Sequence, residues 1–164
     1  MPSTIGCMFK LLALITLLAS GFAPKPELLA KPVPFFDQSI INPYRAPLWE
    51  KGPGHRGIDL VVTEDAPITA PFDGRVFFVG KVVDRKVITL ISDSGLKASF
   101  EPVCSNLVKN QRVFQGYELG FYCEPDPSYE KHCVTCIHFS IRNQHGYLNP
   151  ELFYGLLKPP RLLG

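Results

Sequence analysis

The sequence lacks an excess of charge of either sign, and it lacks long apolar runs. Its 17 Lys and Arg against 15 Asp and Glu give a formal net charge of +2. Because no basic stripe with interleaved aromatic residues is present, this charge pattern argues against a nucleic-acid-binding protein. The apolar run at residues 11–18 ends before Pro24, and it is much shorter than the about 20 apolar residues that span a bilayer as a helix.

Helical periodicity is also nearly absent, whereas turn residues are plentiful. The chain has 16 Pro and 13 Gly, with 46% hydrophobic and 20% charged residues, which is typical of a globular, turn-rich β protein. Its 164 residues favour one domain. Runs of β-branched and aromatic residues bounded by Gly, Asp and Ser predict strands. We expect strands at residues 60–62, 75–79, 82–91, 98–103 and 137–142, and a short helical turn at residues 149–154.

The N-terminal residues have the features of an export signal. Lys10 precedes the apolar run and Gly21 belongs to a plausible cleavage site, so residues 1–21 are expected to be a signal peptide and the protein to be secreted. The alternative is an uncleaved membrane anchor. Residues 22–34, with four prolines, are expected to form an extended tether. The folded domain is expected at residues 35–155 and a tail at 156–164.

Histidine is scarce, with four in the chain, but two of them lie in motifs of metal-ligand type. His55 and Asp59 lie between a Pro-Gly turn and an apolar run, which places a nitrogen and an oxygen at the mouth of a strand. His138 lies on the polar face of the predicted strand 137–142, whose alternate residues are apolar. Two imidazoles and one carboxylate, with a fourth position left for water, are the layout of a hydrolytic zinc centre, so these residues are the predicted Zn²⁺ ligands.

Several further motifs, in their order and spacing, resemble the lysostaphin-type, or LytM-like, zinc metalloendopeptidases that cut peptide bonds in peptidoglycan. The resemblance runs from about residue 35 to residue 153. It implies an antiparallel β-sandwich-like core with the metal site in a groove on one sheet, and it makes His55, Asp59 and His138 the zinc ligands. The motifs are His55-Arg56-Gly57-Ile58-Asp59-Leu60, Ala66-Pro67-Ile68-Thr69-Ala70-Pro71, Asp73-Gly74-Arg75-Val76 to Gly80, Val113 to Gly116 and Gly120, Ile137-His138-Phe139, and Tyr147-Leu148-Asn149-Pro150.

Two family histidines that do not bind the metal are replaced in this chain. In the family's His-x-His motif the first histidine polarises water or stabilises the oxyanion, and Cys136 occupies its position. A family histidine on a middle strand is matched by Pro102. Glu101 is a candidate substitute base, although on a regular strand it faces away from its two neighbours. Because losing one general acid-base group lowers a rate by about 10²–10⁴, the replacements predict slow or absent hydrolysis.

The cysteines favour disulfide bonds. Behind the signal segment Cys104, Cys123, Cys133 and Cys136 remain, an even number in an exported chain, and these allow three pairings. Cys133–Cys136 and Cys104–Cys123 are the preferred pairs, because the other pairings would cross the metal groove. The first pair requires a turn between its cysteines. The alternative is that the Cys136 thiolate closes the zinc site as a fourth ligand.

Three function classes are compatible with these motifs. The first is a zinc metalloendopeptidase acting on peptidoglycan peptides at the cell wall. The second is a catalytically degenerate relative that binds peptidoglycan or activates another cell-wall hydrolase, and the replacements at Cys136 and Pro102 favour it. The run Phe-Glu-Pro-Val at residues 100–103, with His132 and Cys133, also resembles a divergent, secreted actinobacterial-type branch of the family. The third class, a structural exported β domain, requires that zinc does not bind.

Overall fold

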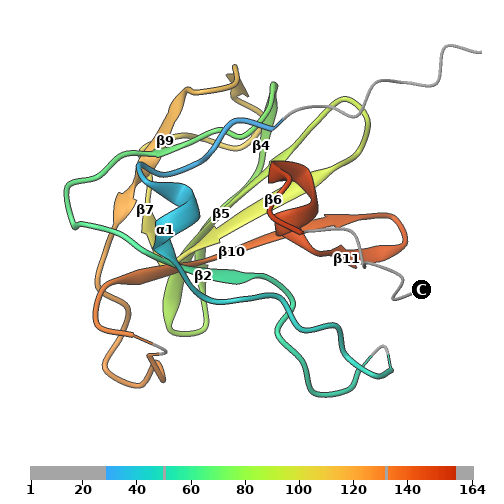
Figure 1. Ribbon diagram of the computed structural model, residues 1–164. Coiled ribbons are helices and arrows are strands. Elements are labelled where there is room, and N and C mark those ends of the chain that lie inside the picture. The colour runs from blue at the N-terminus through green and yellow to red at the C-terminus, as the bar shows by residue number, and fades with distance from the viewer. Residues whose placement is uncertain (1–28, 50, 132, 158–164) are drawn as a thin grey trace, which may run out of the picture.

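The computed structural model describes residues 29–49, 51–131 and 133–157 (Figure 1). The expected signal peptide, residues 158–164 of the expected tail and His132 lie outside the described residues. Among the helices of the described part, none has the length and apolar character needed to cross a membrane.

Antiparallel strands are the main regular secondary structure of the described chain. An eight-stranded sheet has the order β1-β2-β10-β6-β5-β4-β8, with β11 paired to β10, and a three-stranded sheet has the order β3-β9-β7. The strands of the large sheet are β1 (Ile40–Asn42), β2 (Ile58–Val61), β4 (Gly74–Val82), β5 (Arg85–Ile91), β6 (Lys97–Glu101), β8 (Arg112–Val113), β10 (Cys136–Asn143) and β11 (Gly146–Leu148). The small sheet contains β3 (Ile68–Thr69), β7 (Val103–Cys104) and β9 (Glu118–Tyr122).

The central strand β10 separates a buried face from a polar face. Ile137, Phe139 and Ile141 are fully buried and alternate with polar residues, as the two-residue period of a strand requires. Phe139 stacks on Phe100 of β6 with ring centroids 4.7 Å apart. The helix α1 (Phe36–Ser39) and the 3₁₀ helix η1 (Pro150–Tyr154) cover this apolar face (Figure 1), where Phe36 packs against both Phe139 and Tyr154. The opposite face therefore remains available for a site.

Every predicted strand is present, and the all-β prediction is confirmed, as is the short helical turn near the C-terminal end. Pro102 splits the predicted strand 98–103 into β6 and β7, because proline lacks the N–H that a continuous ladder needs. The shorter strands β1, β3, β8, β9 and β11, and the helix α1, were not predicted. Apart from the five-residue β9, these strands have only two or three residues, which are too few to show a period.

Residues 29–34 differ from the expected tether, because they pack against the domain. Leu29 and Val33 are buried in the core. Ala30 N–H donates to the carbonyl of Pro71, and Thr69 N–H donates to the carbonyl of Pro32, both at 2.8 Å. The prolines hold this segment extended, so its remaining backbone groups can pair with the region of β3 while its apolar side chains point inward. The folded unit thus includes residues 29–34 as well as the expected 35–155.

Candidate metal centre and groove

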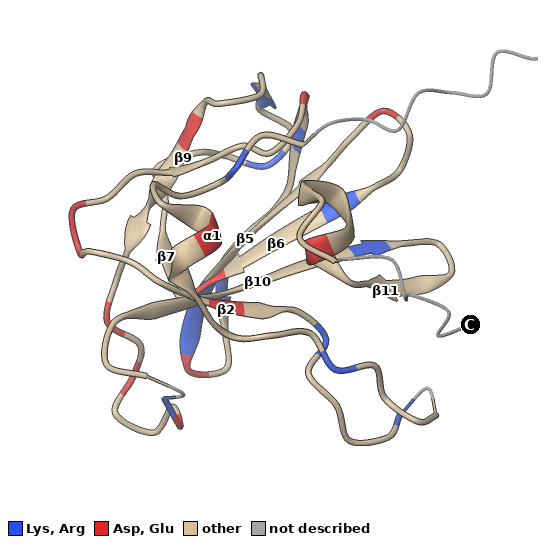
Figure 2. Cartoon of the chain, viewed as in Figure 1, with Lys and Arg blue, Asp and Glu red and all other residues tan. Residues whose placement is uncertain are grey.

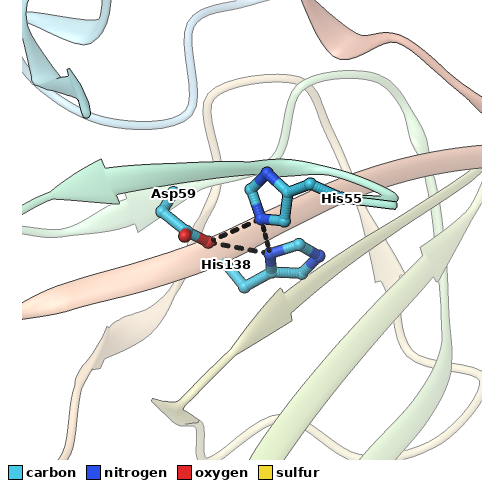
Figure 3. Close-up of side chains that lie close together, drawn as sticks. All are labelled: His55, Asp59 and His138. Atoms are coloured by element: carbon cyan, nitrogen blue, oxygen red, sulfur yellow. Dashed lines mark hydrogen bonds and ion pairs between the residues drawn. The ribbon is translucent and has the colours of Figure 1, made fainter. Parts of the chain in front are cut away.

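Three side chains from separate parts of the sequence meet on the polar face of the large sheet. His55 lies in the loop before β2, Asp59 lies on β2, and His138 lies on β10 directly opposite Asp59 in the strand pairing. Asp59 Oδ1 is 3.1 Å from His55 Nε2 and 2.9 Å from His138 Nδ1, and the two nitrogens are 3.1 Å apart. Figure 3 shows the three groups pointing toward one another. The ligands predicted from the sequence are therefore brought together.

Backbone and side-chain contacts orient this cluster from behind. His55 Nδ1 lies 2.8 Å from the carbonyl oxygen of Pro43, to which it donates, and this leaves the lone pair of Nε2 facing the cluster. Asn42 Nδ2 donates to Asp59 Oδ2 at 2.7 Å, so the other carboxylate oxygen faces the histidines. Arg45 Nη1 in turn donates to Asn42 Oδ1 at 2.7 Å. These outer contacts set the tautomer and the rotamers in the manner of supported metal ligands.

Close backbone packing holds the loop that carries His55. Arg45 and His55 exchange both backbone hydrogen bonds, at 2.8 and 3.0 Å. A Cβ atom at Gly57 would lie 2.6 Å from His138 Nε2 and would also overlap the carbonyl oxygen of Phe139. Only glycine allows the backbone of this loop to approach β10 so closely. The Gly in the His-Arg-Gly motif is thus needed for the distance between the two histidines.

The cluster favours the charged form of its carboxyl group. Burial would by itself raise the pKa of Asp59, but the hydrogen bonds from His138 and Asn42 and the electrostatic interaction with the two histidines outweigh it and hold this pKa well below its usual value. Asp59 is 1% exposed and His55 is 6% exposed. A buried carboxylate that remains ionised beside two imidazoles is a natural cation ligand.

The donor set fits zinc. Two neutral nitrogens and one carboxylate oxygen are the three protein ligands that catalytic zinc sites commonly use. With zinc–ligand bonds of about 2.0–2.1 Å, the edges of a tetrahedron around the ion are about 3.3 Å long. The separations of 2.9–3.1 Å between the donor atoms are close to that length. Small side-chain shifts would bring all three atoms to bonding distance.

Both predicted disulfide pairings are confirmed. Cys104 and Cys123 are bonded with their Cα atoms 5.5 Å apart, and Cys133 and Cys136 are bonded with their Cα atoms 5.9 Å apart. Cys136 therefore has no thiolate to serve as a fourth zinc ligand and no proton to transfer. Cys136, which stands where the family has the first histidine of its His-x-His motif, is a half-cystine. Together with Pro102 it lines a small pocket over the metal cluster.

Glu101, the other candidate for catalysis, lies beside the cluster but is engaged by a neighbour. Its strand partner is His138, so the two side chains share the polar face. Arg85 Nη2 donates to Glu101 Oε1 at 3.3 Å, and Arg85 also forms an ion pair with Asp84 at 2.8 Å. Arg85, Glu101 and His138 line a groove of about 450 Å³ along the sheet. Because Arg85 already contacts this carboxylate, Glu101 is not free to accept a proton from water, which argues against it as the catalytic base.

Sequence reasoning missed the residues that surround the ligands. Asn42 and Pro43 are not among the predicted site residues, although both contact ligand side chains. Tyr122 and Tyr129 line the pocket over the cluster. Burial and the hydrogen bond to Glu124 raise the pKa of Tyr122 to about 12. Burial also raises the pKa of Tyr129, although the nearby Arg85 opposes that shift. No local sequence signal marks these tyrosines.

The chain is similar in sequence to proteins of mycobacteria. The chain is 31% identical over 117 residues to an uncharacterized protein of Mycobacterium tuberculosis and to one of Mycobacterium bovis. The matched residues cover 69% of this chain and 44% of each relative. The chain therefore spans less than half the length of the curated relatives that it matches.

Solved structures share the fold at low sequence identity. The catalytic domain of the antimicrobial peptidase lysostaphin from Staphylococcus simulans has a TM-score of 0.57 at 18% identity, covering 69% of this chain and 89% of that one. A zinc-containing peptidase from Vibrio cholerae has a TM-score of 0.56 at 17% identity, covering 67% of this chain and 35% of that one. A complex of SpoIIIAH and SpoIIQ has a TM-score of 0.64 at 20% identity, covering 76% of this chain and 99% of that one.

The match to a family model covers the whole metal cluster. The model described as peptidase family M23 matches residues 53–150, which include both histidines and the aspartate. This range also contains the central strands β4, β5, β6 and β10. The chain is a member of peptidase family M23, and it shares its fold with the catalytic domain of lysostaphin.

Proposed function

We propose that this domain binds zinc through His55, Asp59 and His138 and acts on the peptide cross-links of peptidoglycan, with weak hydrolytic activity. The observation that carries the proposal is the pairing of an intact, pre-oriented ligand set with a half-cystine and a proline where the family has histidines. Bound zinc would supply a Lewis acid and lower the pKa of a water molecule. The groove along β10 would hold the peptide beside the cluster.

The chain's own residues limit the chemistry. A tetrahedral intermediate needs a proton shuttle and an oxyanion donor. Neither Cys136, within its disulfide, nor Pro102 has a proton to give. Tyr129 is a hydroxyl donor in the same pocket, and its raised pKa keeps it protonated at neutral pH. It could therefore donate to an oxyanion but would not accept a proton from water.

Export is part of this proposal. Both disulfides are compatible with an oxidising compartment outside the cytoplasm, as is the export signal expected at residues 1–21. Peptidoglycan would be accessible to the domain there. The expected location is therefore the cell wall or the space next to it.

The test is to measure zinc content and cell-wall hydrolysis on the same preparation of oxidised protein. We expect one zinc ion per chain and release of soluble peptides from purified peptidoglycan at well below about 1 s⁻¹. Asp59→Ala should lose both, whereas Asp93→Ala, which changes an exposed carboxylate paired with Arg112, should lose neither. Protein that contains no zinc after incubation with an excess of the ion would contradict the metal site.

A second candidate function is binding without hydrolysis, either of peptidoglycan or of another cell-wall hydrolase. The half-cystine at Cys136 favours it, and the structural neighbour named as a SpoIIIAH–SpoIIQ complex supports it by showing this fold in a protein assembly. Sedimentation with purified peptidoglycan tests the first form. Addition of the protein to an active hydrolase, with Asp59→Ala as the control, tests the second.

A further inference from the structure

A second pocket lies at the end of β10 away from the disulfide. It has a volume of about 580 Å³ and is enclosed by the loop between β1 and β2 on one side and by the β10–β11 hairpin on the other. Figure 2 shows Lys and Arg segments on both of these walls. The side chains that matter for its chemistry are Tyr44, Trp49, Arg56, Arg142, His145 and Tyr147.

The described lining of the pocket is cationic. None of the described residues that line it is Asp or Glu, whereas two of them are arginines. Arg56 Nη2 donates to the carbonyl of Gly52 at 3.0 Å, which fixes this guanidinium at the wall. An arginine fork matches the two oxygens of a carboxylate. The lining thus favours an anionic ligand.

Arg142 provides an independent indication of a missing partner. Within the described part of the chain, its Nε atom is buried without a hydrogen-bond acceptor, and its guanidinium forms no ion pair. The guanidinium lies 5.9 Å from the ring centroid of Tyr147, which holds it in place without satisfying its donors. A buried donor without an acceptor destabilises a protein, and more so when it is charged. A bound carboxylate would remove that cost.

The pocket is continuous with the metal groove. Arg56, Arg142 and Tyr147 line both the pocket and the groove that reaches His138. His138 and Arg142 are on the same face of β10, four residues apart. At about 3.3 Å per residue, this separation is about 13 Å, which is the span of about four residues of extended peptide. A peptide lying along β10 could therefore contact both.

We propose that this pocket is a carboxylate-recognition subsite, so that the domain prefers peptides with a free carboxylate about two to four residues from the bond held at the metal cluster. The number of residues is given as a range because a long arginine side chain can reach a carboxylate some distance from its own position on the backbone. The inference rests on the proposed function, because it assumes that a peptide lies beside the metal cluster. The binding of the carboxylate itself does not require hydrolysis. Trp49 and Tyr147 would pack against the apolar part of the ligand.

The test uses Trp49, the only tryptophan in the chain, as a fluorescence reporter in the pocket wall. The oxidised, full-length protein is titrated with a synthetic pentapeptide that has one free carboxylate at its end, and with the same peptide as the carboxamide. Calorimetry provides a second readout. We expect the carboxylate form to bind at least tenfold more tightly, with an affinity that falls as salt is added, because surface charges are screened.

Three variants make the result specific. Arg142→Gln should remove the preference for the carboxylate, and Arg142→Lys should recover only part of it because the fork is lost. Arg112→Gln, at an exposed arginine on β8, should leave the preference unchanged. Circular dichroism confirms that each variant is folded. Equal affinity for the two peptides, or a preference that survives Arg142→Gln, would overturn the proposal.

Two further measurements distinguish this inference from the proposed function and from the binding of a small free anion. Asp59→Ala should still prefer the carboxylate peptide even though it loses zinc, so failure of the metal site and failure of this subsite give different results. Acetate is the probe for a free small anion. If acetate competes as well as the peptide does, the site recognises a small anion only and the peptide proposal is wrong.

Discussion

His138 and Glu101 lie directly opposite each other on β10 and β6, yet only His138 belongs to the metal cluster. The difference comes from their neighbours. His138 Nδ1 faces Asp59 at 2.9 Å, whereas Glu101 is bound by Arg85 at 3.3 Å. The same face of one sheet thus separates a metal-binding end from an ion-paired end. Peptide bound along the groove would meet both.

The hydrogen bond from Asn42 to Asp59 should matter for metal affinity. Asn42→Ala removes the donor at 2.7 Å that keeps Asp59 Oδ1 turned toward the histidines. Because outer-shell contacts of this kind typically contribute a factor of about 10–100, zinc should bind about 10–100-fold more weakly while the fold remains intact. Competition with a zinc-binding dye measures this. Asn106→Ala, at an exposed position, is the matched control, and an equal effect in both variants would contradict a specific role.

The sequence predicted the long elements and the ligands well, and the reasons are local. β5 and β10 have enough alternating residues to show the period of a strand, and His55 and Asp59 are close in the sequence. The environment of the site was harder to predict. Asn42 reaches Asp59 through the pairing of β1 with β2. Tyr129 lies in the loop between β9 and β10, whose path depends on contacts between distant segments, such as the bond from Asp126 N–H to the carbonyl of Asp84 at 2.8 Å.

The docking of residues 29–34 escaped prediction for a different reason. A proline-rich composition predicts an extended backbone but does not reveal whether an edge is available to pair with it. Here the region of β3 provides that partner, and Tyr154 Oη donates to the carbonyl of Ala30 at 3.2 Å. Apolar residues between the prolines, Leu29 and Val33, were the signal that could have indicated burial.

Gly57 should tolerate no side chain. Gly57→Ala places a Cβ against the His138 ring and the Phe139 carbonyl, so the loop must move away from β10. Overpacking of this kind costs about 1–3 kcal/mol, and the expected results are a lower Tm and weaker zinc binding together. Thermal unfolding and zinc titration measure both. The comparison is Gly95→Ala, where a Cβ has free space but φ is +87°, and that variant should lose stability without losing zinc affinity.

Stability should fall above about pH 10 because of Tyr122. Its pKa is about 12 in the folded protein against 10.0 in the unfolded chain. Between these values the unfolded chain loses the proton while the folded protein keeps it, so the stability present below the unfolded pKa is lost as the pH rises through the folded pKa. Denaturant unfolding at several alkaline pH values measures this. Tyr122→Phe should make the free energy of unfolding depend less steeply on pH in this range. An unchanged slope would show that other tyrosines cause the pH dependence.

Weak catalysis should be partly reversible by returning a histidine to the pocket. In the double variant Cys133→Ser with Cys136→His, the disulfide is absent and an imidazole occupies the strand position two residues before His138, on the same face. That imidazole lines the pocket over the cluster and can transfer a proton or stabilise an oxyanion, which Cys136 cannot. Since a positioned acid-base group contributes about 10²–10⁴ in rate, we expect peptidoglycan hydrolysis to rise by at least about tenfold, with the shortfall due to Pro102.

The control for this gain is the variant with Cys133→Ser and Cys136→Ser, which loses the same disulfide without gaining an imidazole. It should show no increase in hydrolysis. Zinc content should be equal in the two variants, so that the rate difference reports the proton-transfer group and not the metal. The rate of the histidine variant should also fall as the pH drops below the pKa of an imidazole, about 6.5 when unperturbed, because a protonated ring cannot accept a proton. A histidine variant that hydrolyses no faster than the serine variant would show that the missing acid-base group is not what limits this domain.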